Sequence, residues 1–285
     1  MGQHRTMRNW IATLAILAVA PLCGSPASAK AVNVAEGIPY GDLPRQQLDL
    51  YRPAVLDDDT PVVVFFYGGG WERGDRGDLQ KTGEALAASG LIVALPDYRL
   101  YPDVAFPEFV EDGALAVAHV WQNERRADGT PRPIFVGGHS AGAFKAALLA
   151  LDDSYLSDAD MPPGALAGAL LLSGPYDYSG PLPPPFSGIF PPETRAASAA
   201  AEFVDAADPP VLLLTGEADD DVDPSSTHTL AAAIEAGGGD VSVAVYPGEP
   251  DHFATVRGLA DAGSAVRRDV EAFMDEALDQ WRRLP

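Results

Sequence analysis

The stretch FVGGHSAGAFKAALLA, residues 135–150, places one serine between two glycines, where an apolar run changes into small helix-forming residues. This serine, Ser140, is either a nucleophile held on a sharp turn or an ordinary turn residue. A nucleophilic serine needs a base, an acid that orients the base, and donors for an oxyanion, whereas a turn needs none of them. The rest of the sequence therefore decides between the two interpretations.

The immediate context of Ser140 favours the nucleophile. Residues 138–142, GHSAG, fit the pattern G-x-S-x-G, with the buried strand PIFVGG expected before it and a helix expected after it. At a strained strand-to-helix turn the neighbours need to lack side chains, so that the serine Oγ projects from the sheet and the helix packs closely. The motif and its surroundings together predict a catalytic serine.

Three consecutive glycines upstream of Ser140 predict a site for the oxyanion. The segment FFYGGGWERGD, residues 65–75, follows the first long apolar strand. A glycine loop there turns its N–H groups toward a developing negative charge, and the N–H of the residue after the nucleophile completes the set. The alternative is a tight glycine turn, which seldom needs three glycines followed by a tryptophan. The expected donors are Gly69, Gly70 and Ala141.

A candidate acid and a candidate base follow Ser140 in the chain. LLLTGEADDDVDP ends one strand in an acidic loop, and VYPGEPDHFATV ends the next strand near His252. Asp219 is the expected acid because it stands at the start of its loop, within reach of a histidine Nδ1, and His252 is the expected base. Solvated acids are expected at Asp220, Asp221 and Asp223, and surface roles at His4, His119, His139 and His228.

Strand and helix patterns alternate along the chain after its first thirty residues. Such alternation predicts one α/β domain over residues 30–285, with a mostly parallel sheet, helices on both faces, and RQQLDLYRP (residues 45–53) as an early edge strand. A proline-rich segment, near residues 174–200, is expected to form a small cap over the open end of the sheet rather than a polyproline ligand. The remaining strands and helices are expected at residues 61–67, 78–90, 91–99, 106–124, 133–138, 164–174, 209–220, 225–239, 241–248 and 267–281, with a helix directly after Ser140.

The composition restricts the possible partners. The 285 residues carry 19 basic and 41 acidic side chains, for a formal net charge of −22. A surface of this sign repels nucleic acid and anionic membranes, so neither is an expected partner. The scattered acids are expected to form a solvated exterior rather than a cation-binding surface. No cluster suggests a metal site or an organic cofactor.

The N-terminal residues 1–29 have the pattern of a secretory signal peptide. Arg5 and Arg8 precede the apolar run WIATLAILAVAPLCG, and Ala27-Ser28-Ala29 provides an Ala-x-Ala cleavage site. The alternative, a retained membrane anchor, is disfavoured because Pro21 interrupts a run that is already short. We therefore expect a periplasmic or secreted mature protein beginning at Lys30. It lacks thiols, because the single cysteine, Cys23, lies within the signal.

These motifs resemble, in the same order, those of α/β-hydrolase-fold carboxylesterases of the BD-FAE-like and hormone-sensitive-lipase-like kind. The segments that carry the resemblance are LDLYRP, YGGGW, PDYRLYPDVAFPEFVEDGALAVAHV, GGHSAGA, SGPYDY, LLLTGEADDDVDP and DHF, which span nearly all of the mature chain. The resemblance implies that Ser140 is the nucleophile, Asp219 the orienting acid and His252 the base, with Gly69, Gly70 and Ala141 as oxyanion donors.

Two positions depart from the family pattern. Tyr67 stands where these enzymes usually have the histidine of His-Gly-Gly-Gly, and Thr215 stands where they often have a histidine before the glycine of the acid loop. In the family the first histidine orders the glycine loop and does no acid–base work. Tyr67 is therefore compatible with catalysis, but the geometry of the glycine loop does not follow from the sequence.

The expected activity is hydrolysis of a small-molecule carboxylic ester through an acyl-enzyme, by a monomer or a homodimer. The expected substrate pocket is aromatic, formed by Tyr67, Trp71, Phe186 and Phe190, together with the loop at residues 98–106 and Ile189. Such a lining suits short-chain, aryl or acetyl esters. The alternatives are an aryl formamide hydrolase and a non-catalytic binding protein that retained the fold. A prolyl peptidase is disfavoured because such enzymes usually carry a large additional domain.

Overall fold

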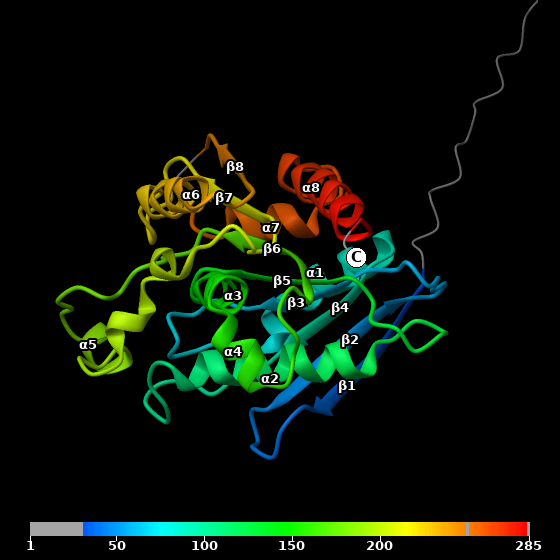
Figure 1. The fold of residues 1–285 in the computed structure, drawn as a ribbon, viewed down its shortest axis with the longest axis horizontal. Helices are drawn as coiled ribbons and strands as arrows, with labels where there is room; N and C mark the ends of the chain where they lie inside the picture. Colours follow the sequence, from blue (N-terminus) through cyan, green and yellow to red (C-terminus); the bar gives the residue numbers. More distant parts are fainter. Residues whose placement is uncertain (1–30, 249–250, 284–285) are drawn as a thin grey trace, which may run out of the picture.

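The computed structural model describes residues 31–248 and 251–283, and the predicted signal peptide, residues 1–29, lies outside these ranges. The described residues form one eight-stranded sheet in the order β1-β2-β4-β3-β5-β6-β7-β8 (Figure 1). The strands from β4 to β8 pair in parallel, whereas β2 is antiparallel to both β1 and β4. The strand bounds are β1 Val32–Pro39, β2 Gln47–Pro53, β3 Val62–Phe66, β4 Ile92–Pro96, β5 Ile134–His139, β6 Leu166–Leu172, β7 Val211–Gly216 and β8 Val241–Tyr246.

The four central strands are continuous apolar runs because both faces of the sheet are covered. Every residue of β3, β4, β5 and β6 is buried. Parallel sheets require such two-sided burial, since their crossover helices pack on the faces. The prediction of a mostly parallel sheet with helices on both faces is confirmed.

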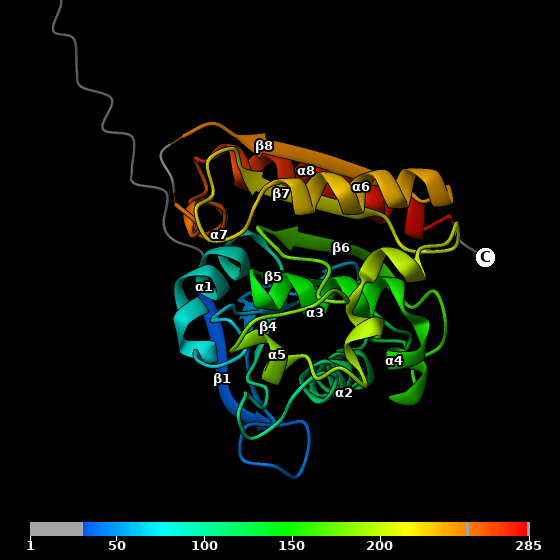
Figure 2. The same ribbon diagram turned by 90° about the vertical axis from the view of Figure 1, so that its left-hand side faces the viewer.

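The helices form two layers around the sheet. On one face, α1 contacts α7 and α7 contacts α8, while on the other face α3 contacts α2 and α4, and α6 packs against β7 and β8 (Figures 1 and 2). The α-helices are α1 Gln80–Ser89, α2 Glu108–Asn123, α3 Ala141–Leu151, α4 Asp153–Asp158, α5 Phe186–Ile189, α6 Ser225–Gly237, α7 Ala254–Ala260 and α8 Ala265–Trp281, and the 3₁₀ helices are η1 Arg76–Leu79, η2 Arg195–Ser198 and η3 Ala200–Phe203.

The prediction that residues 45–53 form an edge strand was wrong. This segment is β2, which lies inside the sheet between β1 and β4, and β1 forms the edge. Strand β1 cannot be recognised from the sequence, because its side chains are half-buried or exposed and its pairing register shifts between Ala35 and Ile38. An edge strand with a bulge has no continuous apolar run to recognise.

Three short α-helices, α4, α5 and α7, were also not predicted. Each has fewer than two full turns, so none has the apolar periodicity from which longer helices are recognised. Helix α7 is important for the candidate site, because it begins two residues after His252 and packs against both α1 and α8. It thus supports the loop that carries the expected base.

The proline-rich segment near residues 174–200 contains only short helical turns. In Figure 1, α5 projects to one side of the molecule, away from the sheet. The segment is tied back to the body of the protein at Phe106, whose N–H donates to the Ile189 carbonyl at 2.8 Å and whose carbonyl accepts from the Thr194 hydroxyl at 2.9 Å.

Candidate active site

Ser140 occupies the sharp turn between β5 and α3. Its backbone dihedral angles are φ 56° and ψ −123°, which are uncommon for a residue with a side chain. Its N–H donates to the Leu172 carbonyl of the neighbouring strand β6 at 2.9 Å. Strain of this kind persists only where the surroundings impose it, and it is typical of functional sites. The turn has the conformation expected of a nucleophile.

The two glycines that flank Ser140 are required by close backbone packing. A Cβ atom at Gly138 would lie 2.3 Å from the carbonyl carbon of Gly142, and one at Gly142 would lie 2.2 Å from the Phe66 carbonyl oxygen. Side chains at either position would push α3 away from the sheet. The G-x-S-x-G pattern therefore reflects how closely this helix approaches β3 and β5.

His252 and Asp219 form a direct contact between two loops. The His252 Nδ1 lies 2.9 Å from Asp219 Oδ2 and 3.0 Å from Asp219 Oδ1. Asp219 follows β7 and His252 follows β8, so the parallel pairing of these strands brings their carboxyl ends together. The Asp219 carboxylate has no exposed surface and the His252 side chain is 5% exposed. A buried carboxylate on Nδ1 holds the imidazole in one orientation and one tautomer.

The environment of Asp219 favours its ionised form. Burial alone raises the pKa of its carboxyl, but hydrogen bonds from the Val222 N–H, from His252 and from the Asp221 N–H together outweigh burial. The pKa of Asp219 is consequently below its usual value. A carboxylate that stays ionised stabilises a positively charged imidazole.

His139, for which a surface role was expected, is buried and contacts the candidate base. Its Nε2–H donates to the His252 carbonyl at 2.9 Å, and the two imidazole rings are 4.5 Å apart. The pKa of His139 is lowered to about 4, mainly by burial and secondly by the nearby His252. A neutral His139 thus fixes the backbone of His252. His139 occupies the variable position of the G-x-S-x-G motif, so the sequence does not indicate that it contacts His252.

The glycine loop, residues 68–74, lies beside the nucleophile. A Cβ atom at Gly68 would be 2.9 Å from the Ser140 Cβ. Gly69 and Gly70 have φ of 118° and 62°, which allow the backbone to turn back toward the serine. Ala141 is the first residue of α3, so its N–H has no acceptor within the helix.

A cavity of about 850 Å³ contains most of the predicted site residues. Ser140, His252 and the glycines of the loop line it, and Asp219 lies behind His252. Aromatic and aliphatic side chains form much of the wall, and charged side chains also contribute. The lining includes Tyr67, Trp71, Leu79, Tyr178, Phe186, Phe253 and Val256 among apolar and aromatic residues, and Arg73, Asp78, Lys81, Asp221 and Arg257 among charged ones.

Of the predicted pocket residues, Ile189 and the loop at residues 98–106 do not line the cavity, and neither does Phe190. It is fully buried, with its ring 4.4 Å from that of Tyr178 and 4.8 Å from that of Trp71. Phe190 therefore supports the pocket wall from behind. The sequence does not distinguish an aromatic residue that faces a cavity from its neighbour that packs against it.

The described residues contain no group of three or more His, Cys, Asp or Glu side chains arranged to hold a metal ion. Among the same residues, no helix combines the length and apolar character needed to cross a membrane.

Two family models match separate parts of the chain. The BD-FAE model matches residues 48–161, which include the glycine loop and Ser140. The prolyl oligopeptidase family model matches residues 186–280, which include Asp219 and His252. Each element of the predicted site thus falls within a segment similar to a known family of hydrolases.

Curated relatives include an isoprenylcysteine alpha-carbonyl methylesterase from Arabidopsis thaliana, 29% identical over 239 residues, which cover 76% of this chain and 56% of that protein. The kynurenine formamidase of Danio rerio is 30% identical over 140 residues, covering 49% of this chain and 45% of the relative. The chain therefore spans only about half the length of these two relatives.

Among solved structures, a truncated form of a carbohydrate esterase from gut microbiota has a similar fold. The TM-score is 0.75 at 19% identity, and the similarity covers 89% of this chain and 99% of the other. Three observations point to the same fold. They are the shared sheet, the strand-to-helix turn at Ser140 and the matches to the two family models. The chain is therefore an α/β-hydrolase, of the group that includes carboxylesterases.

Proposed function

We propose that this protein is a serine hydrolase that cleaves carboxylic esters through an acyl-enzyme. The observation that carries the proposal is the buried contact between His252 Nδ1 and the Asp219 carboxylate, at the cavity that Ser140 also lines. A strained serine, an oriented histidine and a glycine loop around one cavity constitute the machinery of acyl transfer.

In the proposed mechanism His252 accepts the Ser140 proton as the serine Oγ attacks the ester carbonyl carbon. The oxyanion that forms is held by the N–H groups of Gly69, Gly70 and Ala141. His252 then donates the proton to the departing alcohol, and water repeats the sequence on the acyl-enzyme. Each oxyanion donor of this kind contributes about 3 kcal/mol to the transition state in well-studied hydrolases.

The proposed substrates are short-chain, aryl or acetyl esters. Trp71, Tyr178 and Phe186 give the cavity an aromatic wall next to Ser140, which suits a small acyl or aryl group. The methylesterase and the carbohydrate esterase to which the chain is similar both act on esters, according to their names. A series of p-nitrophenyl esters with graded acyl length measures the preference, and kcat/KM is expected to decline as the chain lengthens.

A second candidate activity is the hydrolysis of aryl formamides. The similarity to a kynurenine formamidase favours it, because the same serine chemistry cleaves a formamide. The ratio of kcat/KM for an N-formyl aryl amine and for p-nitrophenyl acetate discriminates between the two activities. A ratio above one makes the formamidase the principal activity.

Replacement of the nucleophile and of the base tests the proposed mechanism. Ser140→Ala and His252→Ala are each expected to lower kcat by about 10⁴-fold or more while the fold is retained, and the double variant is expected to be little worse than either single one. An alkyl fluorophosphonate should label the wild-type protein and not Ser140→Ala. Substantial turnover by Ser140→Ala contradicts the mechanism, and a wild-type protein that is not labelled indicates a binding protein instead.

We also propose that the mature protein is periplasmic or secreted and that it is a monomer or a homodimer. The export signal in residues 1–29 supports the first statement. Light scattering on the purified protein measures the second.

A further inference from the structure

The glycine loop beside Ser140 has an unusual backbone that the surroundings must hold in place. Four of its seven residues have positive φ: Gly69 at 118°, Gly70 at 62°, Trp71 at 63° and Gly74 at 104°. Trp71 is not a glycine, so this conformation costs energy. Because the loop is expected to supply two oxyanion donors, whatever holds it also controls catalysis.

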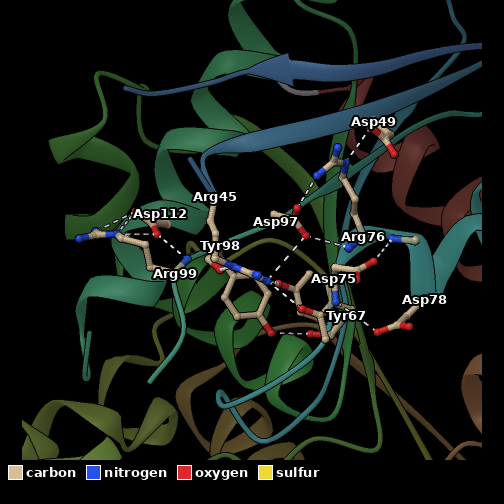
Figure 3. Close-up of polar contacts among 12 residues, drawn as sticks. Arg45, Asp49, Tyr67, Asp75, Arg76, Asp78, Asp97, Tyr98, Arg99 and Asp112 are labelled. Atoms are coloured by element: carbon tan, nitrogen blue, oxygen red, sulfur yellow. Dashed lines mark hydrogen bonds and ion pairs between the residues drawn. The ribbon is translucent and has the colours of Figure 1, made fainter. Parts of the chain in front are cut away.

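The start of the loop is held by two tyrosines. The Tyr98 hydroxyl donates to the Tyr67 carbonyl at 2.8 Å, and the two rings stack with their centroids 4.5 Å apart (Figure 3). Both side chains are buried, with Tyr98 fully enclosed and Tyr67 2% exposed. The last residue before the glycines therefore has a fixed position.

One guanidinium connects the start of the loop to its end. Arg45 Nη2 donates to the Tyr67 phenol oxygen at 2.7 Å and to the Gly74 carbonyl at 2.7 Å, while Nε donates to the Tyr98 carbonyl at 2.7 Å. Gly74 also lies against the ring of Tyr67, since a Cβ atom there would be 2.8 Å from its Cδ2. In Figure 3 the Arg45 side chain points toward both tyrosines.

Arg45 itself comes from the connection between β1 and β2, which is remote in sequence from the loop. The Tyr40 N–H donates to the Gln46 carbonyl at 2.9 Å and the Tyr40 hydroxyl donates to the Asp97 carbonyl, so this connection is attached to the sheet. Arg45 is only partly exposed, at 34% of its side chain. A planar guanidinium holds several acceptors in fixed directions, which a lysine ammonium does not.

We propose that Arg45, acting through Tyr67 and Gly74, is a positioning residue that holds the glycine loop in its oxyanion-binding conformation. This inference rests on the proposed function. Tyr67 stands where the resemblance leads one to expect a histidine, and its phenol oxygen takes the Arg45 bond that closes the loop. Arg45 does not itself line the cavity that contains Ser140, and its contacts with that cavity run through Tyr67 and Gly74.

The expected result is a defect in kcat and not in substrate binding. Arg45→Met should lower kcat for p-nitrophenyl acetate by about 10- to 100-fold with KM unchanged within about twofold, because small displacements of oxyanion donors act on the transition state. Tyr67→Phe removes one oxygen and should lower kcat by about 3- to 10-fold. The kcat of Arg45→Lys should lie between that of the wild type and that of Arg45→Met.

A transition-state mimic separates this role from a merely structural one. A trifluoromethyl ketone forms a tetrahedral oxyanion on the serine, so its affinity should fall by the same factor as kcat/KM in each variant, whereas the product acetate should inhibit all of them equally. The matched control is Arg52→Met on β2, which breaks an ion pair with Glu124 and leaves the loop untouched. Its kcat and ketone affinity should equal those of the wild type.

Three results overturn the proposal. They are an Arg45→Met variant with wild-type kcat, a lowered kcat with unchanged ketone affinity, and an equal loss in Arg52→Met. If Arg45→Met does not fold, Tyr67→Phe decides in its place, and wild-type kcat and ketone affinity in that variant overturn the proposal. If the wild-type protein hydrolyses no ester, it is the proposed function that fails, and the two failures are therefore distinguishable.

Discussion

The four aspartates of the acidic loop, Asp219, Asp220, Asp221 and Asp223, differ in what their side chains contact. The Asp219 carboxylate is hydrogen-bonded to His252 Nδ1 and has no exposed surface, whereas Asp220, Asp221 and Asp223 are exposed. Asp219→Asn should lower kcat by about 10³- to 10⁴-fold, because an amide no longer fixes the tautomer of the imidazole. Steady-state kinetics on p-nitrophenyl acetate measures this effect.

The matched control for Asp219→Asn is the same substitution one residue later. Asp220→Asn changes the charge equally and should alter kcat by less than about tenfold, since surface charges are largely screened. A larger loss in Asp220→Asn than in Asp219→Asn would show that the loop has a different arrangement in solution.

His139 makes stability depend on pH because it stays neutral when buried. Its pKa falls from 6.5 to about 4 in the folded protein, so between these values the unfolded chain binds the proton and the folded protein does not. Stability is therefore lost as the pH falls through this window. From pH 6.5 to pH 5 the wild type should lose about 2 kcal/mol more unfolding free energy than His139→Gln, whose amide still donates to the His252 carbonyl.

Urea denaturation of both proteins at the two pH values measures this difference directly. The variant removes the contribution of His139 and leaves every other ionisable side chain in place in both proteins. Parallel losses in the two proteins would mean that His139 is protonated in the folded state.

At the scale of elements, the turn between β5 and α3 depends on how closely the helix approaches the sheet. Gly142→Ala would place a Cβ atom 2.2 Å from the carbonyl oxygen of Phe66, the last residue of β3 before the glycine loop. We expect a loss of about 1–3 kcal/mol in unfolding free energy and a fall in kcat of about 100-fold, because overpacking moves both Ser140 and the loop. Thermal denaturation and ester hydrolysis measure the two effects.

Gly180→Ala is the control for this change, because nothing lies within 4 Å of a Cβ atom at Gly180. It should leave both stability and kcat close to those of the wild type. Equal effects of the two substitutions would show that chain flexibility, and not the contact between α3 and β3, explains the loss.

At the scale of the whole molecule, the predicted signal peptide implies that the active chain begins after residue 29. Arg5, Arg8 and the apolar run before Ala27-Ser28-Ala29 predict cleavage after Ala29. N-terminal sequencing of the protein expressed with its full N-terminus in a bacterial host with a secretion pathway should identify Lys30 as the first residue. An active protein that retains Met1 or Gly2 would contradict the prediction.

The sequence by itself determined the class of the fold and the order in which the candidate site residues follow one another along the chain. Continuous apolar strands that alternate with helices are a local pattern of the sequence. When such strands pair in parallel, their carboxyl ends all lie at the same edge of the sheet. Ser140, Asp219 and His252 could be selected because each follows such a strand and because the side chains required for acyl transfer are few. The confirmed fold rests on these local patterns.

Only the tertiary structure decided which side chains meet across the sheet. The edge strand β1 lacks an apolar run, Phe190 turned inward behind the pocket, and His139 contacts a carbonyl 113 residues away. Arg45 has no motif of its own, yet its guanidinium joins two ends of the glycine loop. Such contacts depend on distances between segments remote in the chain, which no local pattern of residues specifies.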